Sequence, residues 1–199
     1  MLFLVTQSVA ICALVSIVAG SNYPDCDVPK DTGTGNNITQ KFYFDEEWKA
    51  CLGFKFSGEG GNSNQFDSVR ECRRSSFRSR PLLFVHSADH CVSVDQTICN
   101  GPGKARERAR EIFGGQFICP WGYSLRGGWP FPYCCLTVNQ IAIGEAWDNR
   151  CPDGSKAGGV MDGESLEVTI ARSCDDLICR RGERCVQVNR SFAKCCGTQ

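Results

Sequence analysis

Thiols are the side chains with the most chemical potential in this sequence, because 15 of its 199 residues are cysteines. Thiols at this density either bind metal ions or form disulfide bonds. Structural zinc sites use paired Cys-x2-Cys or histidine-containing spacings, and no spacing of that kind recurs here. We therefore predict disulfide bonds, with no metal site and no cofactor.

The two histidines, His86 and His90, lie four residues apart, which would place both imidazoles on one face of a helix. A metal site would need further ligands, and nucleophilic catalysis would need a positioned serine or cysteine beside one imidazole. The nearby serines lack the G-x-S-x-G context of an activated nucleophile. We expect a protein that is not an enzyme.

An apolar run from Leu2 to Val18, ending in small residues and preceding any charged side chain, predicts a signal peptide over residues 1–20. A membrane anchor is the alternative, because no Lys or Arg precedes the run, but the run is short for a membrane span. Cleavage removes Cys12 and leaves 14 of the 15 cysteines, which can form seven disulfides in an oxidising compartment. We expect a secreted, extracellular protein without membrane contact after cleavage.

The charges of the chain balance, with 22 Lys and Arg residues against 22 Asp and Glu residues. A chain without excess positive charge does not attract polyanions, so we expect no nucleic-acid partner. The 21 glycines beside the cysteines favour a fold held by crosslinks rather than by one large hydrophobic core.

The elements that would position the thiols are clearest in the N-terminal part. Residues 38–45 and 50–56 are rich in aromatic and β-branched side chains and flank a polar turn, which predicts an antiparallel hairpin. Ser68 and Glu71 have the spacing of a capping box, which predicts a short helix carrying Cys72. These elements bury little surface, so we expect a disulfide from Cys51 to Cys72, worth about 3 kcal/mol in the loop-entropy model.

Two stretches of the middle region also have patterns from which structure can be predicted. The alternating Glu and Arg residues of 104–112 favour a second short helix with a solvated face. The aromatic group of Trp121, Trp129, Phe131 and Tyr133 is either an exposed binding ridge or a cover for the neighbouring disulfides. The second use is the commoner one in small disulfide-rich modules.

The C-terminal half contains two copies of one cysteine pattern. The second copy, over 150–199, has six cysteines that can close among themselves: Cys151, Cys174, Cys179, Cys185, Cys195 and Cys196. The first copy, over 91–136, has five, and Leu125 occupies the position of Cys185. Each copy ends in adjacent cysteines, whose Cα atoms are too close for an unstrained mutual disulfide, so each must reach a different partner. The pattern resembles the lustrin-type cysteine-rich repeats.

Three cysteines of the N-terminal part have a specific spacing, with 24 residues between Cys26 and Cys51 and 20 between Cys51 and Cys72. Phe54, Phe56 and the pattern G-x-x-G-N-x-N-x-F over 58–66 accompany them. These features resemble the Kunitz (pancreatic trypsin inhibitor type) family, and its nematode branch in particular. The resemblance implies a small α+β domain in which a hairpin is followed by a C-terminal helix.

The chain departs from this family at the residues that would clamp its inhibitory loop. The second, fourth and sixth family cysteines fall on Gly35, Glu59 and Ser76, so two of the three family disulfides cannot form. The resemblance places the protease-binding loop at Gly35, Asn36, Asn37 and Ile38, with a secondary loop at Glu59 and Gly60. Asn36, at the position that enters the specificity pocket (P1), is neither a cation nor a large apolar side chain. We expect the unclamped loop to be mobile unless other contacts hold it, and we do not expect tight inhibition.

Two Asn-x-Ser/Thr motifs predict glycosylation of a secreted chain, at Asn37 and at Asn189. A glycan on Asn37 would block docking of the loop. The alternative is that the first motif is unused, because strand hydrogen bonds near Ile38 shield it.

An odd cysteine is left over in each of two regions. Cys26 has lost its family partner, and the first cysteine-rich copy contains an odd number of thiols. We predict that these two unpaired cysteines form a disulfide that ties the N-terminal domain to the middle region.

Together these features predict a small disulfide-rich α+β protein with a Kunitz-like domain at 21–77, a linker at 78–90 and two loop-rich cysteine repeats at 91–136 and 150–199. The resemblance implies a secreted protein of the serine protease inhibitor family, acting on extracellular serine proteases in cuticle or matrix formation and moulting. The competing interpretation is a non-inhibitory structural or adhesive module, whose partners are components of the extracellular matrix.

Overall fold

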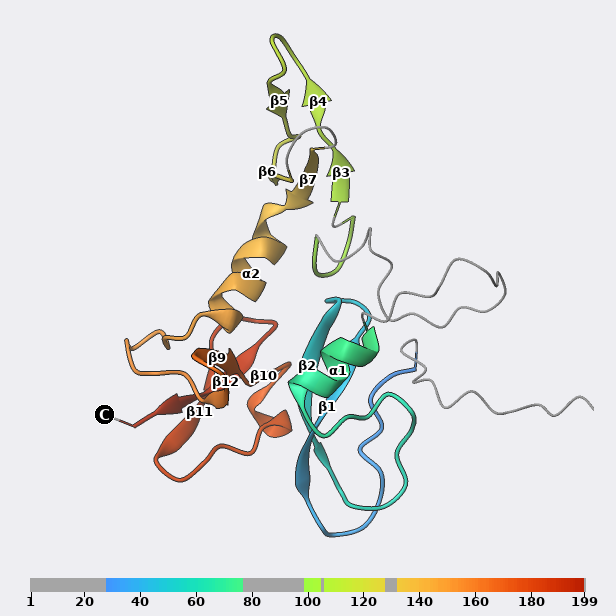
Figure 1. Cartoon of the computed structure of the whole chain (residues 1–199), viewed down its shortest axis with the longest axis vertical. Coiled ribbons are helices and arrows are strands. Elements are labelled where there is room, and N and C mark those ends of the chain that lie inside the picture. The colour runs from blue at the N-terminus through green and yellow to red at the C-terminus, as the bar shows by residue number, and fades with distance from the viewer. Residues whose placement is uncertain (1–27, 77–98, 105, 128–131, 199) are drawn as a thin grey trace, which may run out of the picture.

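The computed structural model describes residues 28–76, 99–104, 106–127 and 132–198 (Figure 1). The segments predicted to be a signal peptide (1–20) and a linker (78–90) lie outside these residues, as do Cys26 and both histidines. The described elements are, in chain order, β1 (Thr39–Asp45), β2 (Ala50–Phe56), α1 (Val69–Ser76), β3 (Arg106–Arg108), β4 (Arg110–Glu111), β5 (Phe117–Ile118), β6 (Tyr123–Arg126), β7 (Tyr133–Leu136), α2 (Thr137–Trp147), β8 (Gly159–Asp162), β9 (Ser165–Val168), β10 (Ile170–Ala171), a 3-10 turn (Cys174–Asp176), β11 (Glu183–Gln187) and β12 (Ala193–Gly197).

The N-terminal hairpin and helix lie where the sequence predicts them. Strands β1 and β2 pair antiparallel over their full length, from Thr39 opposite Phe56 to Asp45 opposite Ala50. Helix α1 follows Ser68, whose hydroxyl accepts a 3.0 Å hydrogen bond from the Glu71 backbone N–H. The Glu71 carboxylate reaches back to the N–H of Asp67 at 2.9 Å, one residue before the expected partner. The first contact satisfies an N–H group that the first turn leaves open, and the second ties the preceding residue to the helix.

A five-stranded sheet joins the hairpin to the end of the chain, in the order β1-β2-β10-β12-β11. The joint is a parallel pairing of β2 with β10, at Gly53 and Ala171. A Cβ atom at Gly53 would lie 2.9 Å from the Gln40 side-chain amide nitrogen and 3.4 Å from the Ile170 carbonyl oxygen, so a larger residue there would displace the Gln40 side chain. The residues of the predicted domains 21–77 and 150–199 therefore share one sheet.

Both faces of the hairpin are buried, and each face belongs to a different core. Phe42 and Phe44 of β1 pack with Val69 and Cys72 of α1. The intervening Tyr43 points to the other face, where Trp48, Phe54 and residues of α2, β10 and β12 form the larger cluster. The Trp48 and Phe192 rings meet edge to face, with centroids 4.5 Å apart. The alternation of a strand thus directs neighbouring aromatic side chains into two cores.

The two cysteine-rich copies share one strand arrangement. In the first copy β7 lies between β3 and β6, and in the second β12 lies between β10 and β11. Leu125 of β6 is opposite Cys134, just as Cys185 of β11 is opposite Cys195. Leu125 therefore occupies the structural position of Cys185, as the repeat alignment predicts.

The expected helix over 104–112 is wrong. Residues 106–108 and 110–111 form strands β3 and β4 instead of a helix, because their backbones pair with β7 and β5. Of the predicted aromatic group, Trp121 is 99% exposed and covers no disulfide, Tyr133 is half-buried, and Trp129 and Phe131 lie outside the described residues. Phe113, outside that group, is 90% exposed. Phe113 and Trp121 flank β5, on the arm of short strands that projects from the rest of the described chain at the top of Figure 1.

Candidate functional site

Main-chain hydrogen bonds hold the predicted protease-binding loop at the end of the hairpin away from the arm (Figure 1). Thr34 and Glu59 exchange two hydrogen bonds, with N–H to carbonyl oxygen distances of 2.8 and 2.9 Å. The Asn37 N–H donates to the Ser57 carbonyl at 3.0 Å, and the Ser57 N–H donates to the Thr32 carbonyl at 2.8 Å. These bonds join the two segments that a disulfide would join in the family pattern, so they are the contacts that hold the loop.

The backbone at Gly35 disfavours a cysteine. Its φ angle is +96°, a region that residues with a Cβ atom rarely adopt, and an added Cβ would lie 3.0 Å from the Ser57 carbonyl oxygen. It would also lie 3.4 Å from Glu59 Cγ. The loop is therefore built around the glycine and is not the family loop with its disulfide deleted.

A buried asparagine anchors the segment that leads into the loop. Asn64 is fully buried, its side-chain oxygen accepts from the Phe44 N–H at 2.8 Å, and its amide nitrogen donates to the Phe44 and Val28 carbonyls at 2.9 Å. Asn62 donates in the same way to the Pro29 carbonyl at 2.8 Å. These hydrogen bonds fix the start of the described chain on the hairpin.

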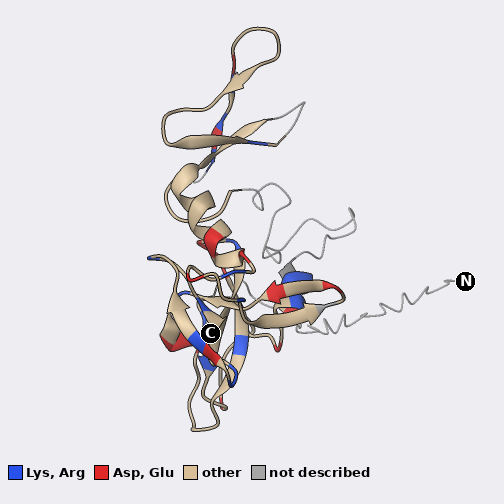
Figure 2. Cartoon of the chain, turned by 90° about the vertical axis from the view of Figure 1, so that its left-hand side faces the viewer, with Lys and Arg blue, Asp and Glu red and all other residues tan. Residues whose placement is uncertain are grey.

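The loop side chains face solvent. Asn36, Asn37 and Glu59 are exposed, and Ile38 is 58% exposed. Residues 32–40 include no charged side chain, whereas Figure 2 shows both signs of charge interspersed over the rest of the body. The structure therefore brings the predicted loop residues together as an exposed, uncharged segment beside Glu59 and Gly60.

The vicinal cysteines reach different partners in both copies. In the second copy Cys195 bonds to Cys179 and Cys196 to Cys151, while Cys174 bonds to Cys185. In the first copy, Cys134 bonds to Cys119 and Cys135 to Cys99. Cys51 bonds to Cys72. All 12 cysteines among the described residues are thus paired, and within the second copy the pairing is closed.

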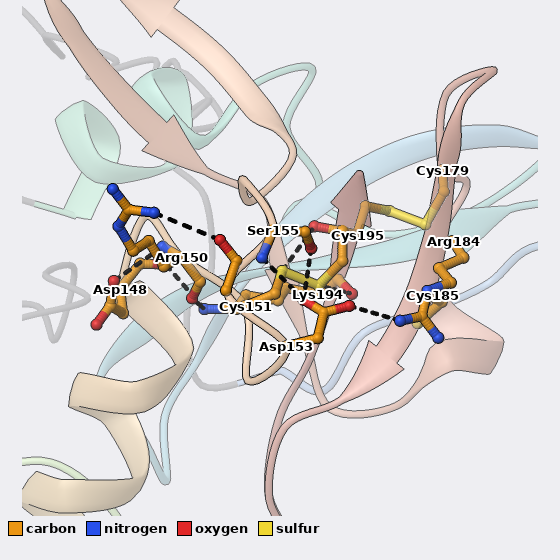
Figure 3. The surroundings of a disulfide bond; sticks show 12 residues. Asp148, Arg150, Cys151, Asp153, Ser155, Cys179, Arg184, Cys185, Lys194 and Cys195 are labelled. Atoms are coloured by element: carbon orange, nitrogen blue, oxygen red, sulfur yellow. Dashed lines mark hydrogen bonds and ion pairs between the residues drawn. A yellow bond between two sulfur atoms is a disulfide. The ribbon is translucent and has the colours of Figure 1, made fainter. Parts of the chain in front are cut away.

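A lysine beside this disulfide cluster is fully buried, and the sequence reasoning missed it. Lys194 of β12 donates from Nζ to the carbonyls of Asp148 and Arg150 at 2.8 Å (Figure 3). It also donates to the Glu145 carbonyl at 2.9 Å. These carbonyls lie at or just beyond the end of α2, where intrahelical donors run out and a cation is favoured by the helix dipole. Burial lowers the pKa of Lys194, and the nearby carboxylates of Asp148 and Glu145 oppose that shift.

The turn after Cys151 carries a carboxylate, Asp153, that accepts several hydrogen bonds. Asp153 accepts from the Ser155 hydroxyl at 2.6 Å and N–H at 2.9 Å, and from Arg184 at 2.6 Å (Figure 3). The hydrogen bonds from Ser155, followed by Arg184, lower the pKa of Asp153 to about 2. The Arg184–Asp153 ion pair joins the Cys151 turn to β11, while the disulfide from Cys151 joins it to Cys196 of β12.

The two glycosylation motifs differ in their surroundings. Asn37 is exposed and its side-chain amide makes no hydrogen bond with the described residues. Asn189 donates from Nδ2 to the Ala142 carbonyl and to the Glu145 carboxylate, both at 2.9 Å. Its side-chain oxygen accepts from the N–H groups of Ser191 and Phe192.

Within the described ranges, no group of three or more His, Cys, Asp or Glu side chains is arranged to hold a metal ion. The helices of that part of the chain are all too short or too polar to cross a bilayer.

Comparisons with known proteins place the N-terminal residues in a family. The Kunitz/Bovine pancreatic trypsin inhibitor domain matches residues 25–75. The chain is 24% identical to the major allergen Ani s 1 of the nematode Anisakis simplex, over 94% of each chain. It is 37% identical to the Kunitz-type serine protease inhibitor bitisilin-1 of Bitis gabonica, over 39% of this chain and 88% of that protein.

A further relative is the Kunitz-type conkunitzin-S1 of Conus striatus, 38% identical over 25% of this chain and 58% of that protein. No solved structure matches the chain. The hairpin, the helix and the Cys51–Cys72 disulfide all lie within the matched segment. Through residues 25–75, the chain belongs to the Kunitz/bovine pancreatic trypsin inhibitor family.

Proposed function

We propose that this chain is a secreted, non-enzymatic Kunitz-type regulator of extracellular serine proteases. The observation that carries the proposal is the exposed loop at Gly35, Asn36, Asn37 and Ile38, held by the Thr34–Glu59 hydrogen bonds. A loop ordered before contact loses less conformational entropy on binding than a mobile one. Glu59 and Gly60 form the adjoining secondary contact.

The proposed contact is modulatory rather than tight, and the reason is the side chain at Asn36. An acidic specificity pocket selects a cation and an apolar pocket selects a large apolar side chain. A neutral amide supplies neither, so its burial leaves polar groups incompletely paired. The relative from Anisakis simplex is consistent with a nematode setting, and we propose cuticle or another extracellular matrix as the place of action.

The test measures the residual activity of trypsin-, chymotrypsin- and subtilisin-type enzymes with the purified chain lacking residues 1–20 and carrying no glycan. Asn36→Lys supplies a cation at the pocket position, and we expect it to strengthen inhibition of the trypsin-type enzyme at least ~10-fold over the natural chain. Asn149→Lys makes the same change at an exposed site after α2 and should have no effect. The proposal fails if neither the natural chain nor Asn36→Lys changes any of the three activities.

A second candidate function is a non-inhibitory structural or adhesive matrix module. The observation that favours it is the exposure of Phe113 and Trp121 on the arm, since fully exposed aromatic rings are favoured at contact surfaces. Retention of the natural chain in insoluble matrix, lost on changing both rings to Ser, together with no effect on any protease, would favour this function over the first.

A further inference from the structure

We propose that Asn37 is a glycan acceptor, that Asn189 is not one, and that the glycan on Asn37 masks the protease-binding loop. The masking step rests on the proposed function, whereas the choice of acceptor rests only on secretion and on the surroundings of the two asparagines. Both asparagines belong to Asn-x-Ser/Thr motifs, so the motif itself does not distinguish them.

N-glycosylation replaces one hydrogen of the side-chain amide nitrogen with a sugar. The donor class is a lipid-linked oligosaccharyl pyrophosphate of the secretory pathway. Nδ2 forms a bond to C1 of the first sugar and loses one proton, while the bond from C1 to the pyrophosphate oxygen breaks and the pyrophosphate leaves with the electron pair. One N–H remains on Nδ2, so a modified asparagine donates at most one hydrogen bond from that atom.

Asn37 meets these requirements in the folded chain. Its side chain is exposed, its Nδ2 donates no hydrogen bond to the described residues, and its backbone N–H is already paired with the Ser57 carbonyl. Modification therefore leaves the described hydrogen bonds of the loop intact. Thr39, the third residue of the motif, begins β1 and is not buried.

Asn189 does not meet them. Both N–H groups of Nδ2 are used, one by the Ala142 carbonyl and one by the Glu145 carboxylate, each at 2.9 Å. A sugar on this atom would remove one of the two bonds and would have to fit between α2 and the turn before β12. A chain glycosylated at Asn189 would therefore lose part of the contact that joins these elements.

The masking follows from the adjacency of Asn36 and Asn37. A glycan is bulky and hydrated, and here it would stand beside the side chain that is proposed to enter the specificity pocket. The unmodified chain is thus the protease-facing form, and the glycosylated chain is the silent form.

The experiment expresses the full chain in a secreting eukaryotic host and measures the intact mass of the product. Asn37→Gln should remove one core glycan mass, and Thr39→Ser, which keeps the motif, should retain it. Ser191→Ala destroys the second motif without touching the Asn189 side chain, and should leave the mass unchanged. The acceptor assignment is overturned if the natural chain carries no glycan at Asn37, or if Ser191→Ala loses one.

The same proteins then enter the protease assay. The glycosylated natural chain should act on the responsive protease at least ~10-fold more weakly than its Asn37→Gln variant. Equal action by both forms overturns the masking. If neither form affects any protease, the proposed function fails and the masking falls with it, while the mass measurement still decides which asparagine is the acceptor.

Discussion

Replacing Lys194 with methionine tests the role of the buried ammonium group at the end of α2. The Nζ atom donates to three carbonyls at 2.8–2.9 Å, and the residue is fully buried. Methionine keeps most of the side-chain volume but donates no hydrogen bond. Three carbonyl oxygens at the junction of α2 and β12 would then lose their partner.

The expected loss follows from these contacts. A hydrogen bond from a charged donor contributes about 1.5–3 kcal/mol, and part of that sum is offset by the desolvation that lowers the pKa of Lys194. We therefore expect Lys194→Met to lower the free energy of unfolding by about 3–5 kcal/mol. Lys156→Met, at an exposed lysine of the same region, should change it by less than about 0.5 kcal/mol.

Urea unfolding with the disulfides intact provides the measurement, because the slope should be unchanged and only the midpoint should move. The lowered pKa also predicts the direction in which stability changes with pH. Above the pKa of folded Lys194 and below 10.5, unfolding takes up a proton, so the stability of the natural chain should rise with pH in that window. A Lys194→Met protein within about 1 kcal/mol of the natural chain, with the same dependence on pH, would refute the reasoning.

Three further predictions follow from other contacts. The Asp153 pKa of about 2 lies below the ordinary 3.8, so the stabilisation from its charged form is present above pH 3.8 and is lost as the pH falls toward 2. In the Asp153→Asn protein, the free energy of unfolding should therefore depend less on pH in that range than in the natural chain. Trp48→Ala should lower the free energy of unfolding by about 3–5 kcal/mol, because the Trp48 ring packs on Phe192 in the shared core. Far- and near-ultraviolet circular dichroism should both report one unfolding transition, shifted to lower stability, and two separate transitions would contradict this. Non-reducing peptide mapping of the secreted chain should find Cys26 bonded to Cys91, since the described cysteines pair among themselves and Cys12 belongs to the predicted signal peptide. A free Cys26 thiol would exclude the bond.

The sequence was informative where the signals are local. The aromatic and β-branched runs flanking a polar turn were enough to predict β1 and β2, and the Ser68–Glu71 spacing was enough to predict α1. Adjacent cysteines cannot bond to each other without strain, so divergent partners were expected from covalent geometry alone. The residues of the candidate loop came from the family pattern, but the hydrogen bonds that hold them did not.

The features that were missed depend on distant residues. Helix α2 has Leu136 at its N-cap, β-branched residues and a central glycine, so local propensity is poor. Its apolar residues do not gather on one face either, since the buried face of Asn139, Ile143 and Ala146 includes a polar side chain while Val138 and Ile141 are exposed. The charge pattern of 104–112 suited a helix, yet pairing with β7 and β5 made it strands. Lys194 stands in an otherwise apolar run before two cysteines, which was a signal for burial with a partner.

The parallel joint between Gly53 and Ala171 determines when the protein can fold during its synthesis. The outer edge of β2 has no β10 to pair with until the nascent chain has grown from residue 53 to residue 171. At ribosomal rates of about 5–20 residues per second, that delay is on the order of ten seconds. An unpaired strand edge is a template for aggregation during such a wait. Chains truncated before residue 170 should therefore depend on chaperones, even though their inhibitor-family segment is complete.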